Sequence, residues 1–182
     1  MNKNIPNSTK VVVVGGGVIG CSVAYHLTKY GWKDVVLLER DQLTSGTTWH
    51  AAGLVSQLGP TAAVTKIRKY TLDLYKKLEK EVDHSAGLRI NGALSVAQTN
   101  ARWQELQRQA TTAQLYDVDI KILDKNQIKK NYPIMYTDDL KGGVLMPGDG
   151  AADPSGVTHM LAKGARLGGA KIYEQSPVET IL

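Results

Sequence analysis

The chain has 182 residues, with 22 Lys and Arg against 17 Asp and Glu, and a formal net charge of +5 at pH 7. This length can bury one respectable core, while a charged fraction of 21% with 18 Gly and 6 Pro excludes a disordered or collagen-like chain. The single cysteine, Cys21, excludes a disulfide framework and favours a reducing compartment.

The basic residues are spread along the chain and interrupted by acidic ones, as on a solvated helix face. No zinc-finger spacing and no aromatic RNA-binding segment accompany them, so we expect no nucleic-acid partner. The apolar run Val11–Val14 is too short for a signal peptide or a bilayer span. We therefore expect no membrane partner and a cytoplasmic protein, or a mitochondrial matrix protein if the source is eukaryotic, although no transit peptide is seen.

The first third of the chain predicts a strand, a helix and a second strand, at about 10–15, 18–30 and 34–39. The first strand is a continuous Val run, which suits a parallel strand covered on both faces. Gly31 stands where a helix end needs a residue that tolerates positive φ. Residues 41–59 are rich in Gly, Ser and Thr and have no period, so we expect a loop there.

Later residues predict shorter elements of both kinds. From Pro60, apolar residues recur at three- and four-residue steps and indicate a helix of about six turns. Residues 87–97 suggest strands broken by a tight hairpin turn at Asn91-Gly92. We further expect a helix at 102–116, a strand at 120–123, a short helix capped by Asp124, a strand at 143–146, a helix at 154–167 capped by Asp153, and strands near 172 and from 177. Because the sequence stops on that last strand without tail composition, we expect a truncated chain.

The strongest motif is the glycine run that links the first strand to the first helix. Gly15 allows the tight turn, Gly17 lets the backbone approach a pyrophosphate, and Gly20 lets helix and strand pack closely. The helix start at Val18 and Ile19 presents free N–H groups to the phosphates. With Glu39 ending the second strand as a ribose acceptor, the motif predicts a dinucleotide site. NAD and FAD both fit, whereas Glu39 disfavours the 2′-phosphate of NADP despite the neighbouring Arg40.

Several segments carry a family resemblance. The first βαβ unit resembles the FAD-binding pattern of D-amino-acid-oxidase-like flavoproteins at Gly15, Gly17, Gly20, Ala24, Leu27, Gly31 and Glu39, with one extra residue between Gly31 and the second strand. The segment from Ser45 to Val55 resembles the flavin-attachment segment of the dimethylglycine and sarcosine dehydrogenases. Other segments also resemble this group of enzymes, namely Gly142-Gly143-Val144, Pro147-Gly148-Asp149-Gly150 and Asp153-Pro154, so that the resemblance covers essentially the whole chain.

This resemblance implies FAD carried covalently by His50 through the flavin 8α-methyl carbon. A neutral imidazole nitrogen suits that bond, and the link raises the flavin reduction potential. The neighbouring residues implied to line the cofactor are Ser45, Gly46, Thr47, Thr48, Ala52, Gly53 and Leu54, and Trp49 is expected near the flavin. We assign no catalytic acid, base or carboxylate clamp, because the family draws them largely from later chain.

The resemblance also implies a fold and an activity. The fold is α/β, with a Rossmann-like FAD-binding domain and part of an α+β substrate domain with antiparallel strands. Residues 1–60 would hold the FAD-binding unit and attachment loop, 61–150 would lead into the substrate domain, and 151–182 would return to the FAD-binding domain. The implied activity is oxidation of an N-methyl amine by hydride transfer to FAD, with an electron-transfer flavoprotein or oxygen as acceptor. Tetrahydrofolate belongs to C-terminal domains of the family to which nothing here corresponds.

Three alternatives stay open: a noncatalytic relative like the regulatory subunit of pyruvate dehydrogenase phosphatase, an amino acid oxidase with noncovalent FAD, and an NAD-dependent dehydrogenase. The other histidines, His26, His84 and His159, are expected to be ordinary residues, and no spacing indicates a metal site. Cys21 is expected to pack against the sheet, and Asp149 to serve a loop.

Overall fold

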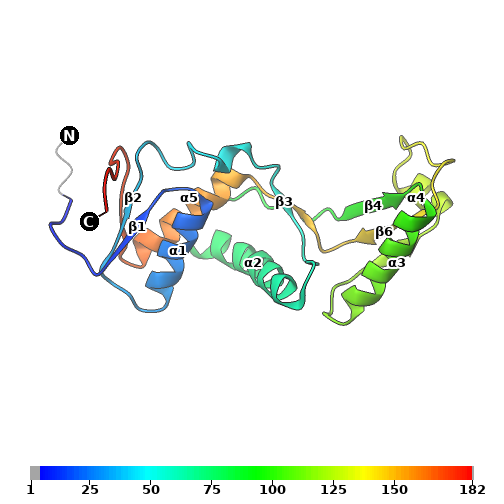
Figure 1. Ribbon diagram of the computed structural model, residues 1–182, viewed down its shortest axis with the longest axis horizontal. Helices are drawn as coiled ribbons and strands as arrows, with labels where there is room; N and C mark the ends of the chain where they lie inside the picture. The colour runs from blue at the N-terminus through cyan, green and yellow to red at the C-terminus, as the bar shows by residue number, and fades with distance from the viewer. Residues whose placement is uncertain (1–4, 182) are drawn as a thin grey trace. The chain divides into compact units, whose positions relative to one another are not determined.

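A computed structural model describes residues 5–181 of the chain (Figure 1). These residues divide into two compact units. The first unit comprises residues 5–53, 74–88 and 152–181, and the second comprises residues 54–73 and 89–151. No helix in the described residues is both long and apolar enough to cross a membrane.

The first unit is built on a parallel sheet of three strands in the order β1 (Val11–Val14), β2 (Val35–Leu38) and β8 (Lys171–Tyr173). In the register, Val11 pairs with Val35 and Val36 pairs with Lys171. Helix α1 (Val18–Lys29) connects β1 to β2, which completes the predicted strand-helix-strand unit. Strands β1 and β2 therefore both point their carboxyl ends at the edge where the glycine run begins.

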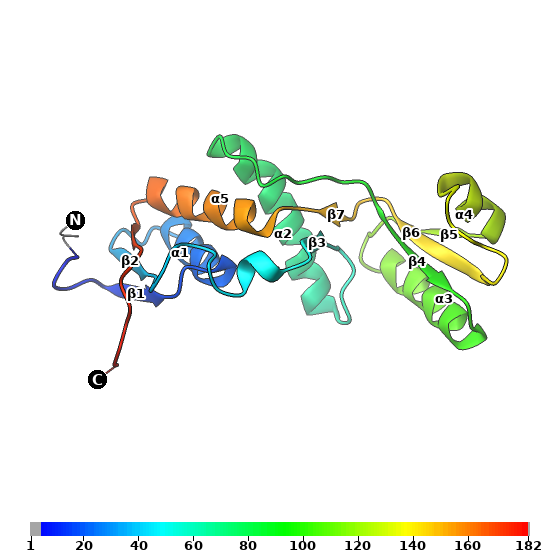
Figure 2. The same ribbon diagram turned by 90° about the horizontal axis from the view of Figure 1, so that it is seen from above.

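Helix α5 (Pro154–Leu167) lies beside α1, as Figure 2 shows. Its start is fixed by Asp153, whose carboxylate accepts from the N–H groups of Ser155 and Gly156 at 3.1 and 3.0 Å. The two helices and the sheet enclose the core of this unit. Its fully buried members include Cys21, Ala24, Leu37, Met160, Leu161 and Ala165, joined by Leu74 and Leu78 of helix α2 (Ala62–Glu81).

One expectation about this sheet is wrong. The Val run predicted a strand covered on both faces, but only one face of β1 is covered by described residues. Val13 is 9% exposed and packs in the core with α1, whereas Val12 and Val14, which alternate to the other face, are 50% and 57% exposed.

The second unit contains an antiparallel sheet in the order β4 (Ala93–Ala97), β6 (Gly142–Met146) and β5 (Lys121–Leu123). Helices α3 (Asn100–Gln114) and α4 (Lys125–Asn131) cover its two faces (Figure 2). Ala97 packs with Leu106 of α3, while Val96, which alternates to the other face, packs with Ile128 of α4. A smaller sheet pairs β3 (Leu54–Val55) with β7 (Gly150–Ala151).

The α/β architecture with separate antiparallel strands confirms the predicted fold class, and most predicted elements are present. Asp124 forms the expected cap of α4, reinforced by Gln127 in a capping box. The hairpin at Asn91-Gly92 is wrong, because the chain before the turn bridges Ala151 through Arg89 and the chain after it pairs with β6. The strand expected from 177 is also wrong, since residues 177–181 have no regular structure, and Leu182 lies outside the described residues.

Candidate functional site

The glycine run forms a tight turn at the carboxyl end of β1. Gly15 has a φ of +105°, and its N–H donates to the carbonyl of Leu38 at 2.8 Å, which ties the turn to the end of β2. A Cβ at Gly20 would overlap the carbonyl oxygen of Gly15, so α1 and the turn meet at a distance that only glycine permits. These contacts match the positions at which the sequence predicted a turn and a close approach.

The first turn of α1 keeps backbone donors available at this edge of the sheet. Gly17 is the N-cap and supplies no side chain, and the N–H of Val18 donates to the Thr48 hydroxyl at 3.1 Å. Among the described residues nothing accepts from the N–H groups of Gly17 and Ile19. Free N–H groups at a helix N-terminus favour an anionic ligand such as a phosphate.

Glu39 lies directly beside the turn. One carboxylate oxygen accepts from the N–H of Gly16 at 2.5 Å and the other from the N–H of Asp41 at 2.9 Å. Its carboxylate has further lone pairs that can accept from ribose hydroxyls. Arg40 instead faces solvent, where its guanidinium lies 3.8 Å from the Asp41 carboxylate. A carboxylate at this position would repel a 2′-phosphate.

The loop after β2 returns to the glycine turn and ends in a short 3₁₀ helix, Thr48–His50. Thr48 is 7% exposed and is the residue that binds Val18, whereas Ser45, Gly46 and Thr47 are exposed. His50 is exposed, and its imidazole lies against the indole of Trp49 with ring centroids 3.8 Å apart. The His50 imidazole thus lies two residues from Thr48, which contacts the first turn of α1.

The remaining predicted residues follow the 3₁₀ helix along the chain. Ala52 is exposed, and Gly53 has a φ of +71° and accepts from the N–H of Ala152 at 2.9 Å. Leu54 is 80% exposed and belongs to the second unit. Among the predicted cofactor residues, Gly20 packs against Gly15, and Val18 is hydrogen-bonded to Thr48. The N–H of His50 donates to the carbonyl of Thr47, and Glu39 is joined to the turn through Gly16.

Two buried groups beyond this set have perturbed ionisation. Burial raises the pKa of the Cys21 thiol to about 12, so this cysteine packs as an apolar residue, as expected, and is no nucleophile at neutral pH. Burial also raises the pKa of Asp149, opposed by hydrogen bonds from Gln57. One Asp149 oxygen accepts from the Gln57 N–H at 2.9 Å, while Oδ2 has no hydrogen-bond partner among the described residues.

Sequence reasoning missed Leu43, which is 4% exposed and packs over Gly16. The signal was present, because Leu43 is the one apolar residue between Asp41 and Gly46. Its N–H donates to Glu174, 131 positions along the chain, and that pairing has no local signature.

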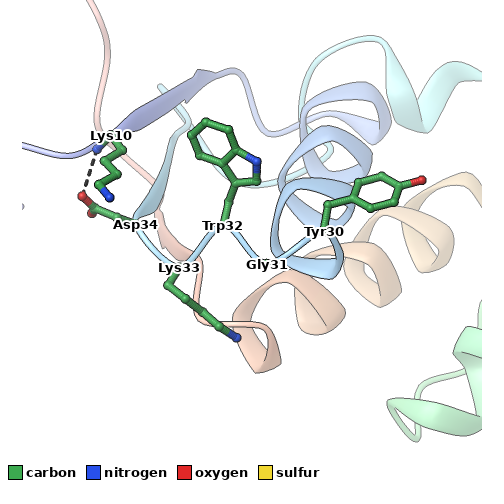
Figure 3. Close-up of a pocket in the computed structure, with 6 residues that line it drawn as sticks. All are labelled: Lys10, Tyr30, Gly31, Trp32, Lys33 and Asp34. Atoms are coloured by element: carbon green, nitrogen blue, oxygen red, sulfur yellow. Dashed lines mark hydrogen bonds between the residues drawn. The ribbon is translucent and has the colours of Figure 1, made fainter.

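A surface hollow of the first unit lies at a different place. It has a volume of about 330 Å³ and is lined by residues 10 and 30–34, at the opposite edge of the sheet from Gly15. Figure 3 shows the rings of Tyr30 and Trp32 and the side chain of Lys33 pointing away from one another, and Asp34 occupied by the N–H of Lys10 at 3.0 Å. These side chains converge on no common point. Within the described residues no three His, Cys, Asp or Glu side chains gather as a metal site would require.

Comparisons with known proteins place this geometry in context. The family model described as "FAD dependent oxidoreductase" matches residues 10–182. Human mitochondrial sarcosine dehydrogenase is 39% identical over 181 residues, which is 99% of this chain and 20% of that protein. The mouse mitochondrial pyruvate dehydrogenase phosphatase regulatory subunit is 33% identical over 178 residues, which is 98% of this chain and 20% of that protein. This chain therefore spans about a fifth of the length of the curated relatives it matches.

Solved structures agree with the fold. The L-proline dehydrogenase of P. horikoshii superimposes with a TM-score of 0.90 and 26% identity, covering 98% of this chain and 47% of that chain. This chain is thus similarly related to an enzyme, at 39% identity, and to a regulatory subunit, at 33% identity. Overall sequence identity therefore does not distinguish between the two roles.

Proposed function

This chain belongs to the FAD dependent oxidoreductase family, and we propose that it is the FAD-binding part of a flavoenzyme that oxidises an N-methyl amine such as sarcosine or dimethylglycine. The observation that carries the proposal is the hydrogen bond between the Thr48 hydroxyl and the Val18 N–H. It joins the segment that bears His50 to the helix start that would bind the pyrophosphate.

The described residues fit FAD. Because Gly17 carries no side chain, a pyrophosphate could approach the unbonded N–H groups of Gly17 and Ile19, while Gly20 lets α1 begin close to the Gly15 carbonyl. Glu39 would accept from the ribose hydroxyls while its two present bonds keep it beside Gly16. Ser45, Gly46 and Thr47 are exposed ahead of the buried Thr48 and would present small side chains to the cofactor.

When bound, FAD supplies a two-electron acceptor for the oxidation of an amine C–N bond to a C=N bond. We propose that His50 carries it covalently. His50 would hold the flavin through a ring nitrogen bonded to the 8α-methyl carbon, a link that would remove one hydrogen from each partner and would therefore need a two-electron oxidant, dioxygen. The exposure of His50 leaves the nitrogen accessible for this bond.

The substrate and the acceptor are also part of the proposal. The name of sarcosine dehydrogenase designates an N-methyl amine as its substrate, and we propose the same class here, with an electron-transfer flavoprotein or oxygen as acceptor. Because this chain spans about a fifth of that relative, the residues that grip the amine are expected outside it. The residues of this chain would hold FAD in place and provide His50 as its point of attachment.

The test is acid precipitation of the full-length gene product, followed by mass spectrometry of its peptides. A yellow pellet with the flavin mapped to His50, lost in His50→Ala and kept in the matched histidine variant His84→Ala, is the expected result and would justify assays with sarcosine and dimethylglycine. Flavin released into the supernatant would refute the covalent link and leave a noncovalent flavoenzyme.

The similarity to the regulatory subunit keeps one alternative, a noncatalytic protein of the same fold. Under that alternative the purified protein carries no flavin and takes up none when FAD is added. The same preparation therefore decides between the two, because its absorbance near 450 nm is read before precipitation.

A further inference from the structure

Glu174 stands directly after the edge strand β8, beside the end of β2. The N–H of Glu39 donates to the carbonyl of Tyr173 at 2.8 Å, which continues the parallel pairing to the carboxyl edge of the sheet. The chain then turns back through Gln175, whose φ is +54°. Glu174 is thereby brought next to the loop that follows Glu39, although the two are distant in sequence.

Three hydrogen bonds join the Glu174 segment to this loop. Two are between backbone groups, from Gln175 N to Asp41 O and from Ser176 N to Glu39 O, both at 2.8 Å. The third is from the N–H of Leu43 to the Glu174 carboxylate, at 2.7 Å. It is the bond of the three that a substitution can remove, and it is charge-assisted, which makes it stronger than a neutral one.

The loop residues beside that bond touch the glycine turn. Leu43 is 4% exposed, and a Cβ on Gly16 would lie 2.5 Å from Leu43 Cδ2, so the leucine side chain covers Gly16 closely. Thr44 donates its N–H to the carbonyl of Gly16 at 3.2 Å and has a φ of +73°. A non-glycine residue holds such a backbone conformation only where its surroundings fix it.

We propose that Glu174 is a positioning residue for the dinucleotide site: its carboxylate holds Leu43 against Gly16 and so keeps the glycine turn shaped for the FAD pyrophosphate. This inference rests on the proposed function. Without the carboxylate, the Leu43 N–H loses its acceptor, and the loop that buttresses Gly16 is held on the Glu174 side by backbone bonds alone. A glutamine keeps an oxygen acceptor at the same place, so it can retain most of this bond without the charge.

The experiment measures FAD affinity in the full-length gene product carrying His50→Ala, so that FAD binds reversibly. In that background, Glu174→Ala is expected to raise the FAD dissociation constant about 10-fold or more, the range for losing a hydrogen bond to a charged group. Glu174→Gln is expected to stay within about 3-fold of the parent, because its amide oxygen still accepts. Glu179→Ala removes the same charge from an exposed residue of the same segment and should leave the affinity unchanged.

Hydrogen exchange gives a readout that needs no cofactor. In the unliganded Glu174→Ala protein, peptides covering 41–45 should exchange faster, while peptides of α5 should keep their protection, because the change is confined to the loop. A general loss of protection would mean that the variant misfolds, and Leu43→Ala then replaces it, since that variant keeps the Glu174 bond and removes the packing on Gly16. It too is expected to weaken FAD binding about 10-fold.

The possible failures are distinct. If the His50→Ala parent binds FAD while folded Glu174→Ala or Leu43→Ala binds it equally well, the positioning role is overturned and the proposed function stands. If glutamine fails to rescue, the oxygen acceptor is not the cause, and the inference is overturned as stated. If the parent takes up no FAD at all, the proposed function fails and takes the inference with it.

Discussion

Substituting Gly20 by alanine tests the close approach of helix α1 to the glycine turn. A Cβ there would overlap the Gly15 carbonyl oxygen and lie 3.1 Å from the carbonyl carbon. The neighbour is backbone and cannot rotate away, so the start of α1 must move. Overpacking of this kind costs about 1–3 kcal/mol, and we take the upper end because no side chain can yield.

The net effect is smaller, because alanine gains about 1 kcal/mol of helix propensity over glycine. We therefore expect Gly20→Ala to lose roughly 2 kcal/mol of unfolding free energy, and to lower the melting temperature by about 4–8 °C if it melts as a domain of 150–250 residues. FAD affinity should fall as well, because a displaced helix start moves the N–H groups of Gly17 and Ile19 out of the positions from which they would bind the pyrophosphate.

Gly164→Ala is the matched control for this prediction. Gly164 also lies inside a helix, so alanine gains the same propensity, but its Cβ would meet the ring of Tyr25 at 2.9 Å, a side chain that can adjust. We expect a smaller loss of stability and an unchanged FAD affinity. Calorimetry of both variants with and without FAD makes the comparison. If Gly20→Ala melts and binds FAD like the wild type, the close approach does not constrain the site and this reasoning is refuted.

Two further predictions concern the Thr48 hydrogen bond and the ionisation of Asp149. Thr48→Val keeps the shape of the side chain but removes the acceptor for the Val18 N–H, and should cost about 1–2 kcal/mol in urea unfolding, whereas Thr48→Ser should be near wild type; equal stabilities would contradict the bond's role. For Asp149, burial raises the pKa, so the folded protein holds the proton more tightly than the unfolded chain, and ionisation lowers stability as pH rises from the ordinary value of 3.8 through the folded one. Asp149→Asn keeps an oxygen that can accept from Gln57 but removes the ionisable group. In urea titrations from pH 4 to 7, the stability of this variant should depend less on pH, and at pH 7 it should be at least as stable as the wild type. An unchanged pH dependence would refute this prediction.

The parts of the fold that the sequence predicts well are those fixed by neighbouring residues. The Val run, the glycine turn and the Asp153 cap act over a few positions, so their chemistry can be read directly and the structure contains all three. The turn at Asn91-Gly92 shows the limit of such reading. Gly92 does take a positive φ of +80°, but the flanking chain pairs with β6 and β7, some fifty residues later. Local chemistry predicts the bend and not the partner.

The candidate site likewise contains some contacts that local sequence predicts and others that depend on distant parts of the chain. Gly15, Gly20 and Glu39 could be assigned from spacing, since a βαβ unit brings the ends of its two strands together. Thr48 could be placed near them only through a resemblance, because nothing in a Ser- and Thr-rich loop indicates which hydroxyl reaches Val18. The pairing of Glu174 with Leu43 had no signal of either kind, since it depends on β8 joining β2 in parallel across most of the chain.

The difference between locally encoded features and long-range contacts affects how function is assigned within the family. The glycine turn follows from local sequence, and a protein can keep it for any nucleotide or for none. Under the two proposals above, a covalent flavoenzyme depends on few contacts: an accessible His50, the Thr48 hydroxyl that ties its segment to Val18, and the Glu174 carboxylate that holds Leu43. Each can be lost by one substitution with the fold intact, so a relative at 33% identity can share the architecture without the chemistry. The discriminating evidence is therefore flavin on His50 rather than any further comparison of folds.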